Sequence, residues 1–390
     1  MRLAYTTEQQ LLRSQIRTYY RELLDETTVQ ALREDPAGPV MRGVVKQMGA
    51  DGWLGLGWPS KYGGQDRSHI DQFIFFDESM RVGAPVPMLT TNTVGPAIME
   101  FGTEEQRSFY LPAILRGDAL FCVGYSEPSA GTDLAALQTS AVRDGSDLVI
   151  NGQKMWTSYA RTAEYCWLAV RTNQSVSKHQ GISIVIVPMN APGITVQPVS
   201  LVGDHEISAV HYDNVRVPLT NVVGGIDNGW SVIITQLNRE RVTLCSPGMV
   251  DRALHEVLSW AQTTDLPDGK KVIDQEWVQR NLALAYAGFE FLRMINWKVA
   301  CDASEDVLRV EDASTTKVFG TEKYLDVIRL LMEIVGETAY LKRGSPGEVL
   351  SSQLESLYRD LVILTFGGGV NEVQRDLISA FGLGLPLSNR

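Results

Sequence analysis

Hydrophobic positions along this chain change their spacing twice, and each change predicts a different kind of secondary structure. From about residue 7 to residue 117 apolar residues recur every third or fourth position, which predicts amphipathic helices, as at Leu12, Ile16, Tyr19 and Leu23. From about residue 120 to residue 223 short β-branched and aromatic runs predominate, separated by turns such as RDGS at residues 143–146. The pattern predicts a helical part followed by a strand-rich part.

Helical spacing returns after residues 228–230 (NGW), as at Tyr324, Val327, Ile328, Leu331, Met332 and Val335. The strand-rich part alone fits a small β-barrel or a sandwich, and a four-helix arrangement is the simplest packing for the last part. We therefore predict three domains. They are a helical N-terminal domain at residues 1–119, a β middle domain at residues 120–224 and a helical C-terminal domain at residues 225–390.

Composition narrows the possible classes of function. The chain has 390 residues, 44% hydrophobic and 21% charged, so it can bury substantial cores. Its net charge of −11 argues against nucleic acid or an anionic membrane as the main partner, because both need clustered cations. The cysteines form no CxxC pair and the histidines have no metal-ligand spacing. Because neither a signal peptide nor a membrane-spanning apolar stretch is evident, we expect a cytoplasmic protein without a metal.

Two short segments of the strand-rich part suggest a ligand. Residues 125–133 read YSEPSAGTD, a turn of small residues whose amides and hydroxyls can bond a ring edge or a phosphate. Within it, Gly131 would let a ligand approach the backbone closely. About twenty residues further on, residues 151–158 read NGQKMWTS. Taken singly, the turn could be a plain connection between strands, and Trp156 could be a core residue.

Together, these segments resemble the TEPGAGSD and NGxKxWITN motifs of the acyl-CoA dehydrogenases, and the resemblance extends over nearly the whole chain. It implies the fold of that family: an α-helical N-terminal domain, a β-barrel middle domain and a C-terminal four-helix bundle. It also implies that FAD is the cofactor. Tyr125, Ser126 and Thr132 would bond the flavin ring, its ribityl chain or its phosphates, while Trp156 and Ser158 would lie against the isoalloxazine.

The reaction implied by the resemblance is α,β-dehydrogenation of an acyl-CoA thioester. A glutamate removes the α proton while the β hydrogen leaves as hydride to the flavin, which gives a 2-enoyl-CoA. Most members carry this base in a C-terminal YEGT(S/A)EIQR segment. Here residues 366–375 read FGGGVNEVQR, which places Gly368 at the base position. A glycine cannot abstract a proton, so we expect Gly368 to line the substrate site instead.

A second base position is filled in this chain. A minority of the family, including isovaleryl-CoA-type enzymes and two-subunit steroid side-chain dehydrogenases of actinobacteria, carries the base in an ER pair after the β domain. Glu240 and Arg241 occupy that place. Burial under substrate would raise the pKa of Glu240 toward the working range, while Arg241 and Arg239 would favour its ionised form. The alternatives are an exposed helix glutamate in a salt bridge and a purely structural Arg241.

Two further departures concern the partner subunit that completes each flavin site in this family. Where RxxFG is expected, residues 265–269 read DLPDG, and where QxxGG is expected, residues 333–337 read EIVGE. Carboxylates there would repel the FAD diphosphate, although they could also be plain surface charges in a reshaped loop. We therefore expect an α2β2 assembly with a second acyl-CoA dehydrogenase-like subunit, similar to the heteromeric steroid side-chain enzymes.

The identity of the substrate follows less directly. Small residues at 367–369 leave space for a bulky, branched or polycyclic acyl group, and the family usually passes its electrons to an electron-transfer flavoprotein. Two other functions stay open. One is a flavin monooxygenase or oxidase of the same fold, and the other is a non-catalytic subunit that stabilises an active relative.

Overall fold

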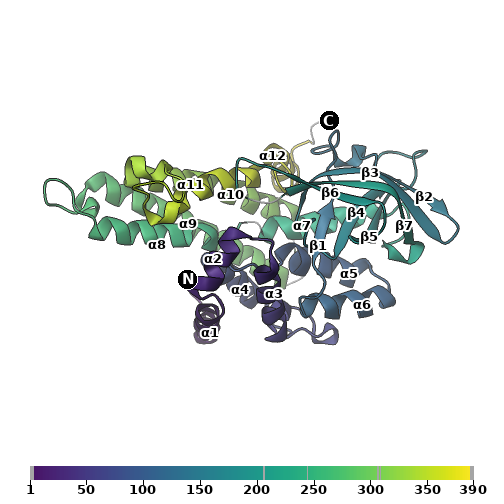
Figure 1. Cartoon of the computed structure of the whole chain (residues 1–390), viewed down its shortest axis with the longest axis horizontal. Coiled ribbons are helices and arrows are strands. Elements are labelled where there is room, and N and C mark those ends of the chain that lie inside the picture. Colours follow the sequence, from purple (N-terminus) through teal and green to yellow (C-terminus); the bar gives the residue numbers. More distant parts are fainter. Residues whose placement is uncertain (1–3, 205–206, 244, 305–306, 308, 387–390) are drawn as a thin grey trace.

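The computed structural model describes residues 4–204, 207–243, 245–304, 307 and 309–386, and it leaves the side chains of residues 238–243 and Ser304 undescribed. Figure 1 shows three parts: N-terminal helices (purple and blue), a curved sheet (teal), and long C-terminal helices (green and yellow). This is the three-part organisation that the spacing of apolar residues predicts. The domain boundaries at 119/120 and 224/225 stay a prediction.

The N-terminal part consists of helices joined by short turns and by longer connections at residues 51–68 and 83–94. The helices are α1 (Thr7–Leu23), α2 (Glu26–Glu34), α3 (Pro39–Ala50), α4 (His69–Val82), α5 (Gly95–Phe101) and α6 (Glu104–Leu115). Capping boxes begin α1 at Thr6 and α6 at Thr103, where the hydroxyl accepts from the third helical amide and a glutamine side chain accepts from the cap's own N–H. A six-residue π-helix, Leu89–Val94, leads into α5.

The middle part is one eight-stranded sheet. Its strands are β1 (Phe121–Gly124), β2 (Ser140–Asp144), β3 (Asp147–Ser158), β4 (Tyr165–Arg171), β5 (Ile182–Pro188), β6 (Ile194–Val199), β7 (Ile207–Pro218) and β8 (Val222–Val223). The order is β6-β7-β3-β2-β4-β5-β8, and β1 pairs with β4. The predicted turn at residues 143–146 joins β2 to β3, and Gly145 supplies the left-handed backbone it needs, with φ of 63°.

The C-terminal part contains the longest helices. They are α7 (Gly229–Thr243), α8 (Gly248–Thr263), α9 (Glu276–Ser304), α10 (Val310–Val335), α11 (Gln353–Asp360) and α12 (Asn371–Leu377). The buried stripe of α10 includes all six positions that the helical spacing singles out. Among the described residues, no helix is both long and apolar enough to cross a bilayer.

Helix α7 lies where the three parts meet. It packs against β5 of the sheet, the π-helix of the N-terminal part and α10 of the C-terminal part. In Figure 1 it appears between the sheet and the long helices. A residue near the end of α7 is therefore well placed to act at a junction of domains, which is where ligand sites are common.

Candidate active site

The segments at 125–133 and 151–158 lie together at one end of the sheet. The first follows β1 and turns back through two backbone hydrogen bonds between Glu127 and Ala130, at 2.9 and 3.1 Å. The second is the end of β3. The Met155 amide donates to the Ser126 carbonyl at 2.8 Å, so the backbones of the two segments are joined directly.

A buried ion pair fixes this arrangement. The Lys154 side chain is completely buried and its Nζ lies 2.8 Å from Oε1 of Glu127, whose side chain is 5% exposed. Lys154 also donates to the Tyr125 carbonyl at 3.0 Å. The Glu127 carboxylate accepts from the amides of Gln138 and Thr139 at 2.7 and 2.8 Å. Each partner of the pair is thus held by further hydrogen bonds, as a buried charge requires.

Burial and pairing shift the pKa values of both groups. Burial lowers the pKa of the Lys154 ammonium to about 8, and the Glu127 charge opposes that fall. For Glu127, burial raises the carboxyl pKa, but Lys154, Thr139 and Gln138 together outweigh it and hold the pKa below its usual value. At neutral pH the pair is charged on both sides.

Trp156 stands out from the strand that carries it. The register between β3 and β7 shifts between Lys154 and Thr157, and Trp156 has φ of 63°, the left-handed region. For a bulky residue that backbone costs about 1–2 kcal/mol. The residue is 52% exposed. The alternative interpretation of Trp156 as a core residue is therefore wrong. Its indole is available to a flat ligand.

The small residues of the first segment, 125–133, leave open space around their backbone. Gly131 and Thr132 are exposed, and a Cβ placed on Gly131 would meet no atom within 4 Å. Ser126 and Ser158 are half-buried. Nothing in the described part of the chain fills the space at Gly131, as a backbone that receives a ligand would require.

Tyr125 behaves differently from its neighbours. It is 7% exposed, packs into the core beneath the sheet, and its hydroxyl accepts from Nε1 of Trp167 at 3.1 Å. The side chain is therefore part of the core. A bond from Tyr125 to a cofactor would come most easily from its backbone.

These features fit a flavin. An aromatic face, an open backbone turn and polar side chains are what a flat heterocycle with a phosphate tail requires. Thr157 and Ser208, which are paired across β3 and β7, do not contribute to this fit, because both are buried on the face of the sheet opposite to the exposed Trp156.

The proposed proton-abstracting residue lies on α7. Glu240 and Arg241 fall within its bounds, Gly229–Thr243, but their side chains lie outside the described residues. Their roles therefore stay predictions.

The glycine loop, residues 366–369, lies directly before α12. Gly368 and Gly369 have φ of 70° and 96°, a backbone that favours glycine strongly over any residue with a Cβ. The backbone conformation at residue 368 therefore favours glycine, whatever the chemistry of the site. A glutamate at this position would be strained as well as chemically different.

The acidic replacements form local contacts. Asp265 pairs with Lys271 at 2.6 Å across a tight turn that also bonds Leu266 to Lys270. Glu333 accepts from Asn281 at 3.0 Å. These contacts agree with the reshaped-loop interpretation.

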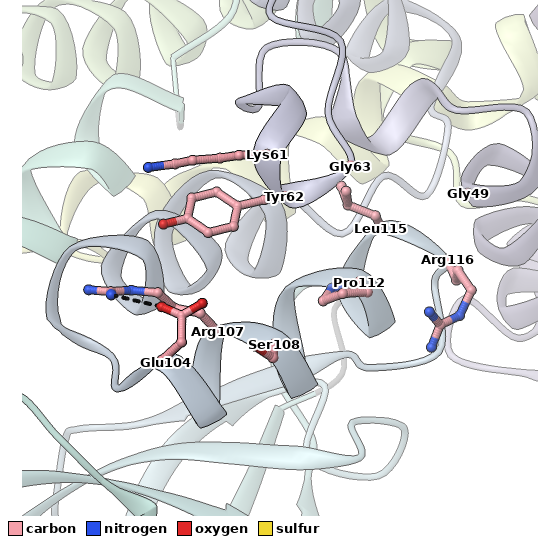
Figure 2. Close-up of a pocket in the computed structure, with 10 residues that line it drawn as sticks. All are labelled: Gly49, Lys61, Tyr62, Gly63, Glu104, Arg107, Ser108, Pro112, Leu115 and Arg116. Carbon is pink, nitrogen blue, oxygen red and sulfur yellow. Dashed lines mark ion pairs between the residues drawn. The ribbon is translucent and has the colours of Figure 1, made fainter.

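A surface pocket of about 490 Å³ lies elsewhere, in the N-terminal part beside α6 (Figure 2). Arg107 in its wall pairs with Glu104 at 3.5 Å, and Lys61 lies 4.7 Å from the ring centre of Tyr62. None of the lining residues belongs to the two segments or to the glycine loop. We assign this pocket no part in the chemistry.

Sequence reasoning missed the Glu127–Lys154 pair, although a signal for it exists. Leu148, Ile150 and Lys154 share the buried face of β3 at even spacing. A lysine on a buried strand face requires a buried partner, so that pattern could have predicted one.

Comparison with known proteins defines the class. Family models for the N-terminal, middle and C-terminal domains of acyl-CoA dehydrogenases match residues 6–118, 122–215 and 227–383. The chain belongs to the acyl-CoA dehydrogenase family, and is thus an oxidoreductase whose family implies a flavin.

Particular relatives are similar over their full length. Acyl-CoA dehydrogenase FadE26 of Mycobacterium tuberculosis is 50% identical over 400 residues, covering 100% of both chains. The structure of the ChsE4-ChsE5 complex from Mycobacterium tuberculosis matches with a TM-score of 0.94 and 51% identity, again over 100% of both chains. The Tcur3481-Tcur3483 steroid ACAD matches with a TM-score of 0.94 and 46% identity over 100% of both chains.

Proposed function

We propose that this chain is the base-bearing subunit of a heteromeric, FAD-dependent acyl-CoA dehydrogenase that oxidises a bulky acyl-CoA thioester to its 2-enoyl-CoA. The observation that carries the proposal is the left-handed backbone of Gly368. It disfavours a carboxylate at the usual C-terminal base position, while α7 supplies Glu240 at the alternative one.

The residues divide the work as follows. Glu240 removes the α proton of the thioester, and Arg241 binds substrate beside it. Gly368 lines the acyl site without adding a side chain. FAD, when bound, accepts the β hydrogen as hydride.

The FAD-binding residues of the proposal come from the two segments on the sheet. The buried Glu127–Lys154 pair holds these segments together, which fixes the polar groups around the ring before it binds. The proposed contacts to FAD come from Tyr125, Ser126, Gly131, Thr132, Trp156 and Ser158.

The proposed substrate class is a steroid side-chain thioester. One relative that is 46% identical is described as a steroid ACAD. Consecutive glycines at 367–369 leave the site free of side chains on this side, which suits a polycyclic acyl group.

The proposed assembly is an α2β2 complex. Two of the similar structures contain two different chains, ChsE4 with ChsE5 and Tcur3481 with Tcur3483. The acidic segments at 265–269 and 333–337 make this chain a poor donor of the second half of an FAD site. An electron-transfer flavoprotein is the proposed acceptor, and the cytoplasm is the proposed location.

Glu240→Gln tests the proposed base. In the complex, this variant should keep its flavin and lose turnover by about 10²–10⁴-fold, the usual contribution of a positioned base. Glu256→Gln is the matched control, because Glu256 is a helix glutamate in an i,i+4 pair with Arg252. The turnover of the Glu256→Gln complex should be close to that of wild type. Undiminished turnover of Glu240→Gln would instead support the non-catalytic-subunit alternative.

Flavin content tests the assembly. Little FAD in the chain purified alone, rising to about one per pair of unlike chains after co-expression with a partner, is the expected result. A full complement of FAD in the lone chain would mean a homo-oligomer. Rapid oxygen consumption without acyl-CoA would favour the monooxygenase or oxidase alternative.

A further inference from the structure

A buried lysine that the proposed chemistry does not use holds the glycine loop. Lys317 lies on α10 and is completely buried. Its Nζ donates to the carbonyls of Thr365 and Gly369, at 3.1 and 2.5 Å, and to Oδ1 of Asn371 at 2.9 Å. One ammonium thus contacts residues on both sides of the loop.

The loop needs such an anchor because glycines constrain the backbone weakly. Gly368 and Gly369 have left-handed φ values, and glycine loses more conformational freedom on ordering than any other residue. Charge-assisted hydrogen bonds from a buried ammonium are stronger than neutral ones. The Lys317 bonds therefore define one conformation for a segment whose own sequence allows many.

The same face of α10 holds the segment that follows α7. The Lys317 carbonyl accepts from Sγ of Cys245 at 3.7 Å, and the Tyr324 hydroxyl donates to the Ser246 carbonyl at 2.5 Å. Between them, Gly320 allows close approach, because a Cβ there would come within 2.7 Å of Cβ of Cys245. Helix α10 therefore contacts both the segment that follows the proposed base helix and the glycine loop.

Asn371 extends this anchor to the start of α12. Its Nδ2 donates to Oγ1 of Thr321 at 3.0 Å and to Oε1 of Glu322 at 3.1 Å. Arg375, one turn further along α12, pairs with Glu322 at 2.7 Å. The glycine loop is thus fixed to α10 by a polar network that begins at Lys317.

We propose that Lys317 is a positioning residue for the dehydrogenation: it sets the glycine loop at the correct distance from α7, so that a bulky acyl group is seated against the base. This proposal rests on the function proposed above. Lys317 acts through the loop backbone and does not touch the reacting atoms. The FAD segments depend on the separate Glu127–Lys154 pair, so flavin binding should not need Lys317.

Lys317→Met in the assembled complex tests this role, with a polycyclic acyl-CoA as substrate. Methionine keeps an unbranched side chain that is one atom shorter and removes the three donors. We expect unchanged FAD content and a fall in kcat/KM of about 10–100-fold, carried mainly by KM, because small displacements of a site have effects of this size. Lys323→Met is the matched control, since Lys323 lies on the same helix in a partly exposed pair with Asp326. It should leave KM unchanged.

Hydrogen exchange separates positioning from general loss of structure. In Lys317→Met, exchange should rise at the amides of residues 366–371 and stay unchanged in β1 and β3. An unchanged KM, or exchange that rises throughout the C-terminal helices, would overturn the proposal. If Lys317→Met does not fold, Asn371→Ala provides the test. We expect this variant to raise KM and the exchange at residues 366–371 by smaller amounts.

These results also distinguish the two proposals. If the wild-type complex fails to oxidise any acyl-CoA, the proposed function fails whatever Lys317 does. Normal catalysis in Lys317→Met, beside an inactive Glu240→Gln, refutes the positioning role alone.

Discussion

Glu127→Gln should destabilise the protein far more than its conservative size suggests. The substitution leaves Lys154 buried without a charged partner and removes an acceptor from one of the two amides that bond the carboxylate. Breaking a buried pair from one side costs about 3–5 kcal/mol. The free energy of unfolding should therefore fall by that amount at neutral pH.

The pKa of Lys154 shows that burial penalises its charged form even while Glu127 is present. With Glu127 present, burial still lowers it from 10.5 to about 8, which corresponds to about 3 kcal/mol for keeping the ammonium charged inside the fold. Without Glu127 the pKa should fall further and Lys154 should lose its proton near neutral pH.

The sign of the pH dependence follows from proton binding. Above a folded pKa of about 8, the unfolded chain binds more protons at Lys154 than the folded chain, so this group's contribution to stability rises with pH up to about 10.5. In Glu127→Gln that rise begins at lower pH. The deficit relative to wild type should be largest near pH 6–7 and smaller at pH 9.

Thermal unfolding of both proteins at pH 6.5 and pH 9 measures this difference. Asp133→Asn is the control, because the Lys178–Asp133 pair has the same 2.8 Å distance but side chains that are 49% and 56% exposed. Its effect should stay below about 1 kcal/mol. Equal effects of the two substitutions, or a Glu127→Gln deficit that grows with pH, would refute the reasoning.

Three further predictions address the flavin site, the glycine loop and acid stability. Trp156→Ala should change the stability of the flavin-free protein by less than about 1 kcal/mol, because the residue is exposed. The same variant should bind less flavin, measured by visible absorbance. A large loss of stability with a normal flavin content would contradict this prediction. Gly368→Ala should lower the free energy of unfolding by about 1–2 kcal/mol, because its backbone is left-handed. Gly131→Ala, whose Cβ would meet open space, should lower flavin affinity and leave stability unchanged. Urea unfolding and flavin titration measure the two effects, and a stable Gly368→Ala or a destabilised Gly131→Ala would contradict the prediction. Burial raises the pKa of the Glu78 carboxyl, but Arg17 and Arg13 outweigh it and the net pKa lies below its usual value, so its stabilisation is present above about pH 4.5 and lost on acidification. The stability difference between wild type and Glu78→Gln should therefore stay constant from pH 7 to about pH 4.5 and shrink only at lower pH. A difference that persists undiminished at about pH 3 would exclude this role.

The three-part organisation was predictable because local spacing reports it directly. Two of the β-branched and aromatic runs in the strand-rich part, residues 147–156 and 165–172, form β3 and β4, and every named position of the α10 stripe is buried. Strand order was not predictable, since β3 pairs with β7 across some fifty intervening residues and local pattern carries no information on such pairing.

The site was predictable as a pair of segments but not as a geometry. Even spacing along β3 would place Trp156 on the buried face with Lys154, but a one-residue bulge puts it outside and turns Thr157 inward. Lys317 lies on the apolar stripe of α10, so the sequence shows an anomalous charge there. Its acceptors, more than forty residues away, become visible only in the fold.

Hydrogen exchange at the α carbon of a bound thioester tests the central claim most directly. A 3-thia-acyl-CoA has sulfur at the β position and cannot give up hydride, so only the proton-abstraction step remains. Incubated in D₂O with the assembled, flavin-loaded complex and followed by mass spectrometry, it should gain α deuterium with wild type. With Glu240→Gln the exchange should fall to the enzyme-free background. Exchange at the wild-type rate in Glu240→Gln would contradict the account, because the base would then lie elsewhere.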